Sequence, residues 1–186
     1  MSAAGPPQGA KAPSGLRAAA AGLPAQAGTA RRGAGSDGSG PRARGGVGAL
    51  VVLDTNIVLD AFVFSDAAAL PLRAGLEDGS LRWIATPDMR IELARVLGYP
   101  QIVPRLAFYG LQADEVLAAF DRHARRVEAA PKAPVTCADP DDQIFIDLAV
   151  RHRCALLSKD RAVLRMRKRL AALGVHAGIA LAHQPA

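Results

Sequence analysis

Acidic residues follow the apolar runs of this chain at four places. Asp54 comes directly after LVVL, Glu92 lies in the stretch after LRWIA, Asp142 stands in ADPDDQIFIDLAV, and Asp160 follows CALLSK. Carboxylates that meet at one edge of a sheet repel one another and raise one another's pKa unless a cation neutralises them. Mg²⁺ and Mn²⁺ take oxygen ligands of this kind. Such ions suit phosphodiester cleavage, because they activate water and stabilise the leaving oxygen.

Two of these carboxylates also have a purely structural interpretation as helix caps. Asp54 stands where a strand turns into a helix, but Thr55 and Asn56 are also able to cap that helix, which leaves the Asp54 carboxylate available. In LLSKDRAVL, Ser158 or Asp160 is suited to cap the next helix. Capping is the default interpretation of Asp160 taken alone.

The other two acids lie in predicted helices. TPDMRIELARVLGYP predicts a helix over 87–97, and Glu92 lies on the border of its apolar stripe, where a solvated rim residue is the commoner case. Asp-Pro-Asp-Asp is typical of a helix start, with Asp139 as the cap. Asp141 and Asp142 both share helix faces with apolar residues, so periodicity leaves the choice between them open.

The elements that must position these acids alternate between short apolar runs and longer amphipathic ones. This pattern predicts an α/β fold, a three-layer α/β/α arrangement with a parallel sheet of about five strands. Ligands of such sheets bind at the carboxyl ends of the strands, where these acids are found. The predicted strands cover 49–53, 81–85, 134–137, 154–157 and 176–181. The predicted helices cover 56–63, 66–78, 87–97, 112–128, 140–151 and 161–173.

The net charge of +6 comes mainly from the N-terminal segment. Residues 1–46 carry six basic side chains against Asp37 alone, which leaves a net +1 for the rest of the chain. The segment is rich in Ala, Gly, Pro and Arg and has almost no large apolar residue, so we expect a disordered extension ahead of a folded domain over 47–186. An organellar transit peptide and a start codon assigned too early are the alternatives.

Other site classes have little support in the sequence. Cys137 and Cys154 share no metal-type spacing with each other or with a histidine, so two buried, reduced thiols are expected. No secretory apolar region and no run of transmembrane length is present, which favours a soluble, cytoplasmic protein.

With its four acids in this order, the chain resembles the PIN-domain family of metal-dependent ribonucleases, in particular the bacterial toxin-component (VapC-like) branch. The matching blocks are VVLDTNIVLDAF, PDMRIELARVL, DPDDQIFIDLA and LLSKDRAVL, and they cover about residues 49–174. The first and third blocks are fairly specific, whereas the second is a common helix pattern.

The resemblance implies a set of catalytic metal ligands for Mg²⁺ or Mn²⁺, namely Asp54, Glu92, Asp142 and Asp160. Family members often have a second Asp where this chain has Gln143, so Asp142 is the match and Asp141 remains a competitor. The supporting polar groups near the first and last ligands are Thr55, Asn56 and Ser158. The resemblance further implies single-stranded RNA as substrate, a small antitoxin as partner, and a homodimer.

The basic run RMRKR near the C-terminus has two interpretations. Val163, Met166, Leu170 and Leu173 form the predicted buried face of this helix, which places Arg165, Lys168 and Arg169 outside. A solvated face is the favoured interpretation, and a track for substrate phosphates is the alternative.

Two rival functions share these residues. A Mg²⁺-dependent phosphatase also places an Asp after its first strand, but it usually has a second Asp two residues on, where this chain has Asn56. The non-enzymatic rival is a catalytically inactive PIN-like module with a binding or regulatory role.

Overall fold

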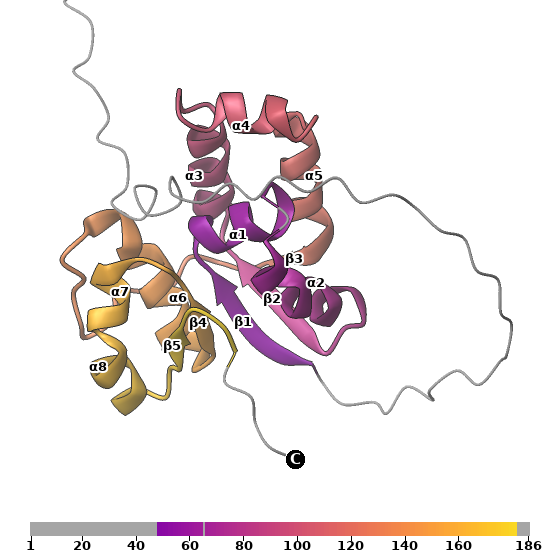
Figure 1. The fold of residues 1–186 in the computed structure, drawn as a ribbon. Helices are drawn as coiled ribbons and strands as arrows, with labels where there is room; N and C mark the ends of the chain where they lie inside the picture. The colour runs from indigo at the N-terminus through magenta and orange to yellow at the C-terminus, as the bar shows by residue number, and fades with distance from the viewer. Residues whose placement is uncertain (1–47, 65, 182–186) are drawn as a thin grey trace, which may run out of the picture.

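The computed structural model describes residues 48–64 and 66–181, and its centre is one five-stranded parallel sheet (Figure 1). The strand order is β3-β2-β1-β4-β5, so the first strand lies in the middle of the sheet. Val51 is paired with Trp83 on one side, and Leu53 with Leu157 on the other. The strands are β1 (Ala49–Leu53), β2 (Leu81–Ala85), β3 (Ala124–Arg126), β4 (Ala155–Leu157) and β5 (Ala177–Gly178).

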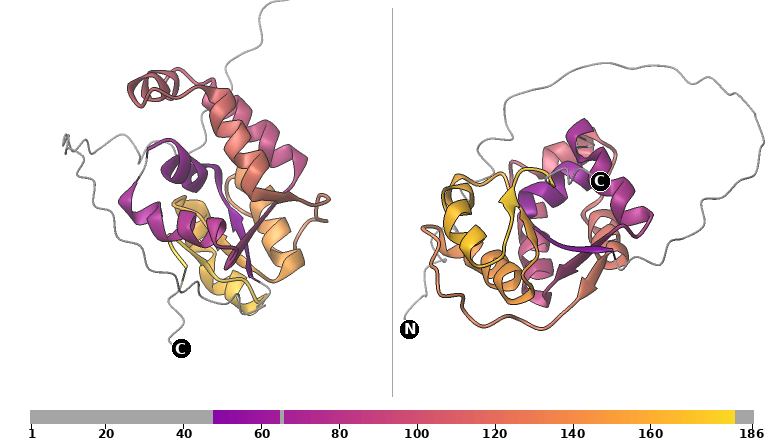
Figure 2. Two further views of the ribbon diagram at one scale, coloured as in Figure 1. Left: turned by 90° about the vertical axis from the view of Figure 1, so that its right-hand side faces the viewer. Right: turned by 90° about the horizontal axis from the view of Figure 1, so that it is seen from below.

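Helices flank this sheet, which confirms the predicted α/β fold. The first group is α1 (Thr55–Phe62), η2 (Ala67–Ala69), α2 (Leu70–Glu77), α3 (Pro87–Leu97), α4 (Val103–Phe108) and α5 (Ala113–His123). The second is η3 (Pro140–Asp142), α6 (Gln143–His152), α7 (Arg161–Arg165) and α8 (Arg167–Ala172). Helices α6, α7 and α8 lie beside β4 and β5, and their orange and yellow ribbons can be followed in Figure 2. No described helix is long and apolar enough to cross a membrane.

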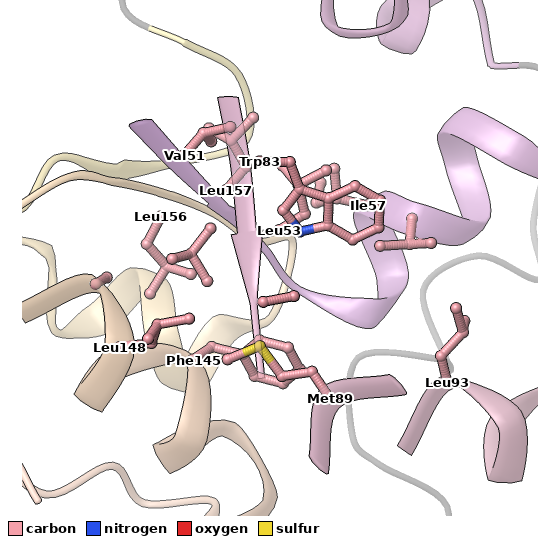
Figure 3. Packing of buried hydrophobic residues seen from close by; sticks show 14 of the residues in the cluster. Val51, Leu53, Ile57, Trp83, Met89, Leu93, Phe145, Leu148, Leu156 and Leu157 are labelled. Atoms are coloured by element: carbon pink, nitrogen blue, oxygen red, sulfur yellow. The ribbon is translucent and has the colours of Figure 1, made fainter. Parts of the chain in front are cut away.

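The core is built around β1, whose last three residues have almost no exposed surface. Helix α6 packs against β1 and β4, and Figure 3 shows its Phe145 and Leu148 close to Leu156. On β2, Trp83 meets the Phe120 ring edge-on, with centroids 4.7 Å apart. Each large apolar side chain buried in this way contributes about 1.5–3 kcal/mol. The strand that ends at Asp54 is therefore held firmly in the middle of the molecule.

Several elements begin and end where the sequence predicts. The ranges of β1, β2 and α3 are those predicted, and Thr86 caps α3 by accepting a hydrogen bond from the backbone N–H of Met89. Both cysteines are buried free thiols, and burial raises the pKa of Cys154 to about 11. The predicted extension at residues 1–46 lies outside the described residues.

The predicted helix over 112–128 is wrong in its last turn. Helix α5 ends at His123, and the chain continues as β3, which pairs with β2 and leads to a hydrogen bond from the Val127 N–H to the Ala85 carbonyl at 2.9 Å. Pairing along the edge of the sheet thus overrides the local helical pattern. The structure also has a helix that the sequence did not predict, α4. The helix predicted over 161–173 is divided at Met166 into α7 and α8.

The predicted strand over 134–137 is also wrong, because α6 holds this segment as a loop. The Gln143 side chain accepts a hydrogen bond from the Cys137 N–H at 2.8 Å and donates one to the Val135 carbonyl at 3.1 Å. Asp147 accepts a hydrogen bond from the Ala133 N–H at 2.8 Å and another from the Gln143 amide at 2.6 Å. Gln143 therefore serves as a clamp for the loop.

Replacing the clamp should loosen this loop. We expect Gln143→Ala to lower the free energy of unfolding by about 1–3 kcal/mol, since it leaves backbone groups of the loop without partners. Amide exchange at Cys137 should become faster. The matched control is Gln101→Ala at an exposed position. Equal urea midpoints for the two variants would show that Gln143 does not hold the loop.

Candidate metal-binding site

Asp54 lies at the carboxyl end of β1, fixed by the neighbouring strand. Its backbone N–H donates to the Leu157 carbonyl of β4 at 2.9 Å, which places it beside the segment that follows β4. The residue is 4% exposed and occupies the N-cap position of α1, but its carboxylate makes no capping hydrogen bond. Capping alone therefore does not account for the burial of this side chain.

Two polar side chains orient the Asp54 carboxylate instead. The Ser158 hydroxyl and the Asn56 amide, the latter at 2.8 Å, both donate to Asp54 Oδ2. Asn56 also accepts a hydrogen bond from the backbone N–H of Lys159 at 3.2 Å, so it ties α1 to the segment after β4. Thr55 and Asn56 are the first residues of α1 and not its cap, which corrects the capping role expected of them. Burial raises the pKa of Asp54 to about 6, while the bonds from Ser158 and Asn56 oppose the shift.

Asp142 is the second buried carboxylate, and its burial distinguishes it from its neighbour Asp141. It is 5% exposed at the start of α6, whereas Asp141 is exposed to solvent. The Oδ2 atom of Asp142 is buried and has no hydrogen-bond partner among the residues that the structure describes. Burial, and then the charges of Asp54 and Asp160, raise the pKa of Asp142 to about 8. An unpartnered oxygen among like charges is a position where a bound cation would relieve the cost of burial.

Asp160 has two roles: it caps α7, and it lies close enough to Asp54 and Asp142 to affect their pKa values. Its Oδ1 accepts a hydrogen bond from the Ala162 N–H at 2.6 Å, which confirms the predicted cap of α7. The residue is 4% exposed, and its negative charge contributes to the raised pKa of both Asp54 and Asp142. Ser158 accepts a hydrogen bond from the backbone N–H of Asp160 at 2.9 Å, so one hydroxyl positions two of the three acids.

Glu92 stands apart from this group. It forms an ion pair with Arg95 on the same helix, and its side chain keeps 15% of its surface exposed. The pKa of Arg95 is raised first by Glu92 and to a smaller extent by Asp141, so Arg95 lies within reach of both acids. The ion pair uses Oε2 of Glu92, so a metal ion that took this oxygen would compete with Arg95.

Asp139 and Asp141 surround the group without joining it. Asp139 caps the 3-10 turn η3, as predicted, by accepting a hydrogen bond from the Asp141 N–H at 3.1 Å. Their charges add to the raised pKa of Asp142. The candidate centre is therefore formed by Asp54, Asp142 and Asp160, with two further acids at its margin.

A salt-bridge cluster beside the centre was not identified from the sequence. Lys159 lies with its Nζ 2.6 Å from Asp60 Oδ2 and 3.3 Å from Asp66 Oδ2. Burial raises the pKa of Asp60, which is 7% exposed, while Lys159 opposes the shift. The cluster joins the end of α1 to the segment that carries Ser158 and Asp160. The signal in the sequence was an acid inside an apolar helical stretch, IVLDAF.

The residues present fit a hard divalent cation by their chemistry. Among residues 48–64 and 66–181, no three His, Cys, Asp or Glu side chains stand in metal-coordinating geometry. The donor set is nevertheless all oxygen, buried, and of one charge, and Asp142 Oδ2 has no other partner. Such donors suit Mg²⁺ or Mn²⁺ better than a soft metal.

The raised pKa of Asp142 predicts how stability depends on pH. Between about pH 4 and pH 8 the unfolded chain loses this proton while the folded protein retains it, so stability falls as pH rises. In EDTA, Asp142→Asn should remove much of that loss and exceed the parent by about 2–4 kcal/mol near pH 8, with no difference near pH 4. Urea denaturation across this range measures the effect, with Asp141→Asn as control. A constant difference at every pH would contradict the assigned burial.

The Lys159 cluster predicts a compensating pair of substitutions. Lys159→Met should destabilise the protein by about 1–2 kcal/mol, because it leaves the Asp60 carboxylate buried without its cation. Adding Asp60→Asn should recover most of this loss. The control is Lys132→Met at an exposed site. Additive losses in the double variant would show that the two side chains are not energetically coupled.

Comparison with known proteins identifies the family. No curated protein matches the chain. The solved structure of VapBC2 from Rickettsia felis, bound to a DNA fragment from its promoter, is similar at 12% identity with a TM-score of 0.47, over 69% of this chain and 98% of that one. A family model described as the PIN domain matches residues 50–162. That segment is more than half of the chain and contains all three acids of the centre, and the chain belongs to the PIN-domain family.

Proposed function

We propose that this protein is an endoribonuclease that depends on Mg²⁺ or Mn²⁺ and cleaves single-stranded RNA. One observation carries the proposal: Asp142 is buried with an unpartnered oxygen, and its pKa is raised by the charges of Asp54 and Asp160. Three carboxylates brought together at such a cost indicate a cationic ligand. Membership of the PIN-domain family supports the same reaction class.

The residues of the centre have separate tasks in this proposal. Asp54, Asp142 and Asp160 would hold the ion, which when bound supplies a Lewis acid for a phosphodiester group. Ser158 and Asn56 fix the orientation of the Asp54 carboxylate, so this ligand is already oriented before an ion binds. Glu92 would be a further ligand, in competition with Arg95 for its Oε2 atom.

The rival functions are weaker on the same residues. The phosphatase usually has a second acid where Asn56 lies, and Asn56 is hydrogen-bonded to Asp54 and to the backbone of Lys159. An inactive module gives no reason to keep three repelling carboxylates in the interior. A role as the toxin of a toxin–antitoxin pair, a small antitoxin partner, a homodimer and a cytoplasmic location remain predictions. Co-expression with the neighbouring reading frame and light scattering test the two assembly predictions.

A cleavage assay tests the proposal. Purified protein should cut a labelled single-stranded RNA in Mg²⁺ or Mn²⁺, and EDTA should stop it. Asp142→Asn should lower the rate at least about 100-fold, because it removes a charge that balances the ion. Asp141→Asn, at the exposed neighbour, should stay within a few-fold of the parent.

Two other outcomes would replace the proposal. Release of phosphate from small phosphoesters without RNA cleavage would favour the phosphatase. Equal cleavage by Asp142→Asn and the parent would show that Asp142 is not part of the reaction centre.

A further inference from the structure

A basic groove lies on the two short helices that follow the acidic centre. It has a volume of about 420 Å³ and is lined by Arg161, Leu164, Arg165, Arg167 and Lys168. All four basic side chains belong to exposed residues, and none forms an ion pair with an acid in the part of the chain that the structure describes. The groove is thus a concentration of positive charge that no described partner neutralises.

The helix break at Met166 determines which basic residues line the groove. In a continuous helix over 161–173, Arg169 would lie nearer to the face of Arg161 and Arg165, and Arg167 would point to another side. The helix instead breaks at Met166 (φ −87°, ψ −4°), and Arg167 at the start of α8 joins the groove while Arg169 does not. Of the residues that the sequence suggested, Arg165 and Lys168 line the groove and Arg169 does not, while Arg161 and Arg167 also line it.

The composition of these helices is unusual for a merely solvated face. Residues 161–172 contain five basic side chains and no acid. Solvated surfaces normally mix both signs of charge, because repulsion between like charges destabilises the folded state. The opposite side of the helices is used by the core, where Val163, Met166 and Leu170 are buried. The basic side is thus free to bind a ligand.

The first lining residue of the groove, Arg161, directly follows Asp160 of the acidic centre in the chain. Helix α7 starts immediately after Asp160, and Arg165 lies one helical turn, about 6 Å, beyond Arg161. A polyanion that approaches the acids of the centre is repelled unless nearby cations hold it. A groove that leads away from Asp160 and carries four cations supplies that attraction.

We propose that this groove binds the phosphate backbone of the RNA strand next to the cleaved bond, without reading its sequence. The inference rests on the proposed ribonuclease function. Arginine and lysine side chains bind phosphate oxygens, and the only apolar residue lining the groove is Leu164. No aromatic ring is among its lining residues, so the groove offers no aromatic stacking surface for bases. Its contribution is therefore electrostatic, and it depends on salt and not on base identity.

Binding measurements in EDTA separate this proposal from catalysis. Fluorescence anisotropy with two labelled single-stranded RNAs of unrelated sequence gives the dissociation constant of the full chain at several salt concentrations. The groove variant is Arg165→Gln/Arg167→Gln/Lys168→Gln. The control of equal charge change is Arg73→Gln/Arg122→Gln/Arg125→Gln, at residues outside the groove. Thermal melts establish that both variants are folded.

The groove variant should bind both RNAs at least about 10-fold more weakly, and equally so for the two sequences. The plot of the logarithm of the association constant against the logarithm of the salt concentration has a negative slope. The magnitude of this slope should be smaller by about 2 in the groove variant, since each phosphate contact on a single strand contributes about 0.7. In Mg²⁺ its KM should rise while kcat stays close to that of the parent. The control variant should bind within a few-fold of the parent.

Three results would overturn the groove assignment. One is equal RNA binding by the groove variant and the control, and another is a loss confined to one RNA sequence. The third is tighter binding of polyglutamate than of RNA, which would make the groove a site for acidic protein segments. Failure of the proposed function is a different result, namely that the parent protein binds RNA through the groove but does not cleave it with any divalent ion.

Discussion

Repulsion among buried carboxylates at the carboxyl ends of β1 and β4 is the constraint on which this site depends. Asp54, Asp142 and Asp160 are each at most 5% exposed, and burial together with mutual repulsion raises the pKa of Asp54 to about 6 and of Asp142 to about 8. Burying such groups disfavours their charged forms and lowers stability. The rest of the domain has to hold them together in spite of this.

The fold meets that demand with a buried strand and a small polar network. The last residues of β1 are buried between β2 and β4, and the backbone of Asp54 is tied to Leu157. The Ser158 hydroxyl then connects the Asp54 carboxylate with the backbone of Asp160. Lys159 lies between these two positions in the chain and anchors the same segment to α1 through Asp60. The segment after β4 is thus held in place by the side chains of Ser158 and Lys159.

The charge that follows the acidic centre in the chain is positive. The acids are followed at once by α7 and α8, in which every charged side chain is basic. Under the proposed function, a cation held by these acids next to a cationic groove would fit a substrate that carries several phosphates better than a small phosphoester. Glu92, the remaining acid of the predicted set, is paired with Arg95 on the same helix.

Local patterns predicted the parts of the fold that local chemistry determines. The ends of α3 follow from Thr86 with Pro87 at one end and Gly98 at the other, and the structure places them there. Pairing between distant segments was beyond such patterns. Strand β3 forms because Ala124 meets Trp83 in the sheet, and the hydrogen bond from Ser158 to Asp54 joins residues 104 positions apart.

The same limit applies to the individual acids. Periodicity left Asp141 and Asp142 equivalent, because both lie on partly apolar helix faces. The 3-10 turn η3 before α6 decides which of them is buried, and sequence periodicity does not reveal that turn. The clamp formed by Gln143 was hidden for a related reason, since its partners lie in a loop that the sequence suggested was a strand.

Calorimetric titration of the full chain with Mn²⁺ tests the central claim most directly, because it measures the cation and not a later step. The account predicts that the parent and Asp141→Asn bind Mn²⁺ with similar affinity, and that Asp142→Asn binds at least about 10-fold more weakly. It also predicts that binding by the parent releases protons to the buffer, since Asp142 has to ionise to become a ligand. Equal binding by all three proteins, or no binding by the parent, would contradict the assignment of this acidic edge as a metal centre.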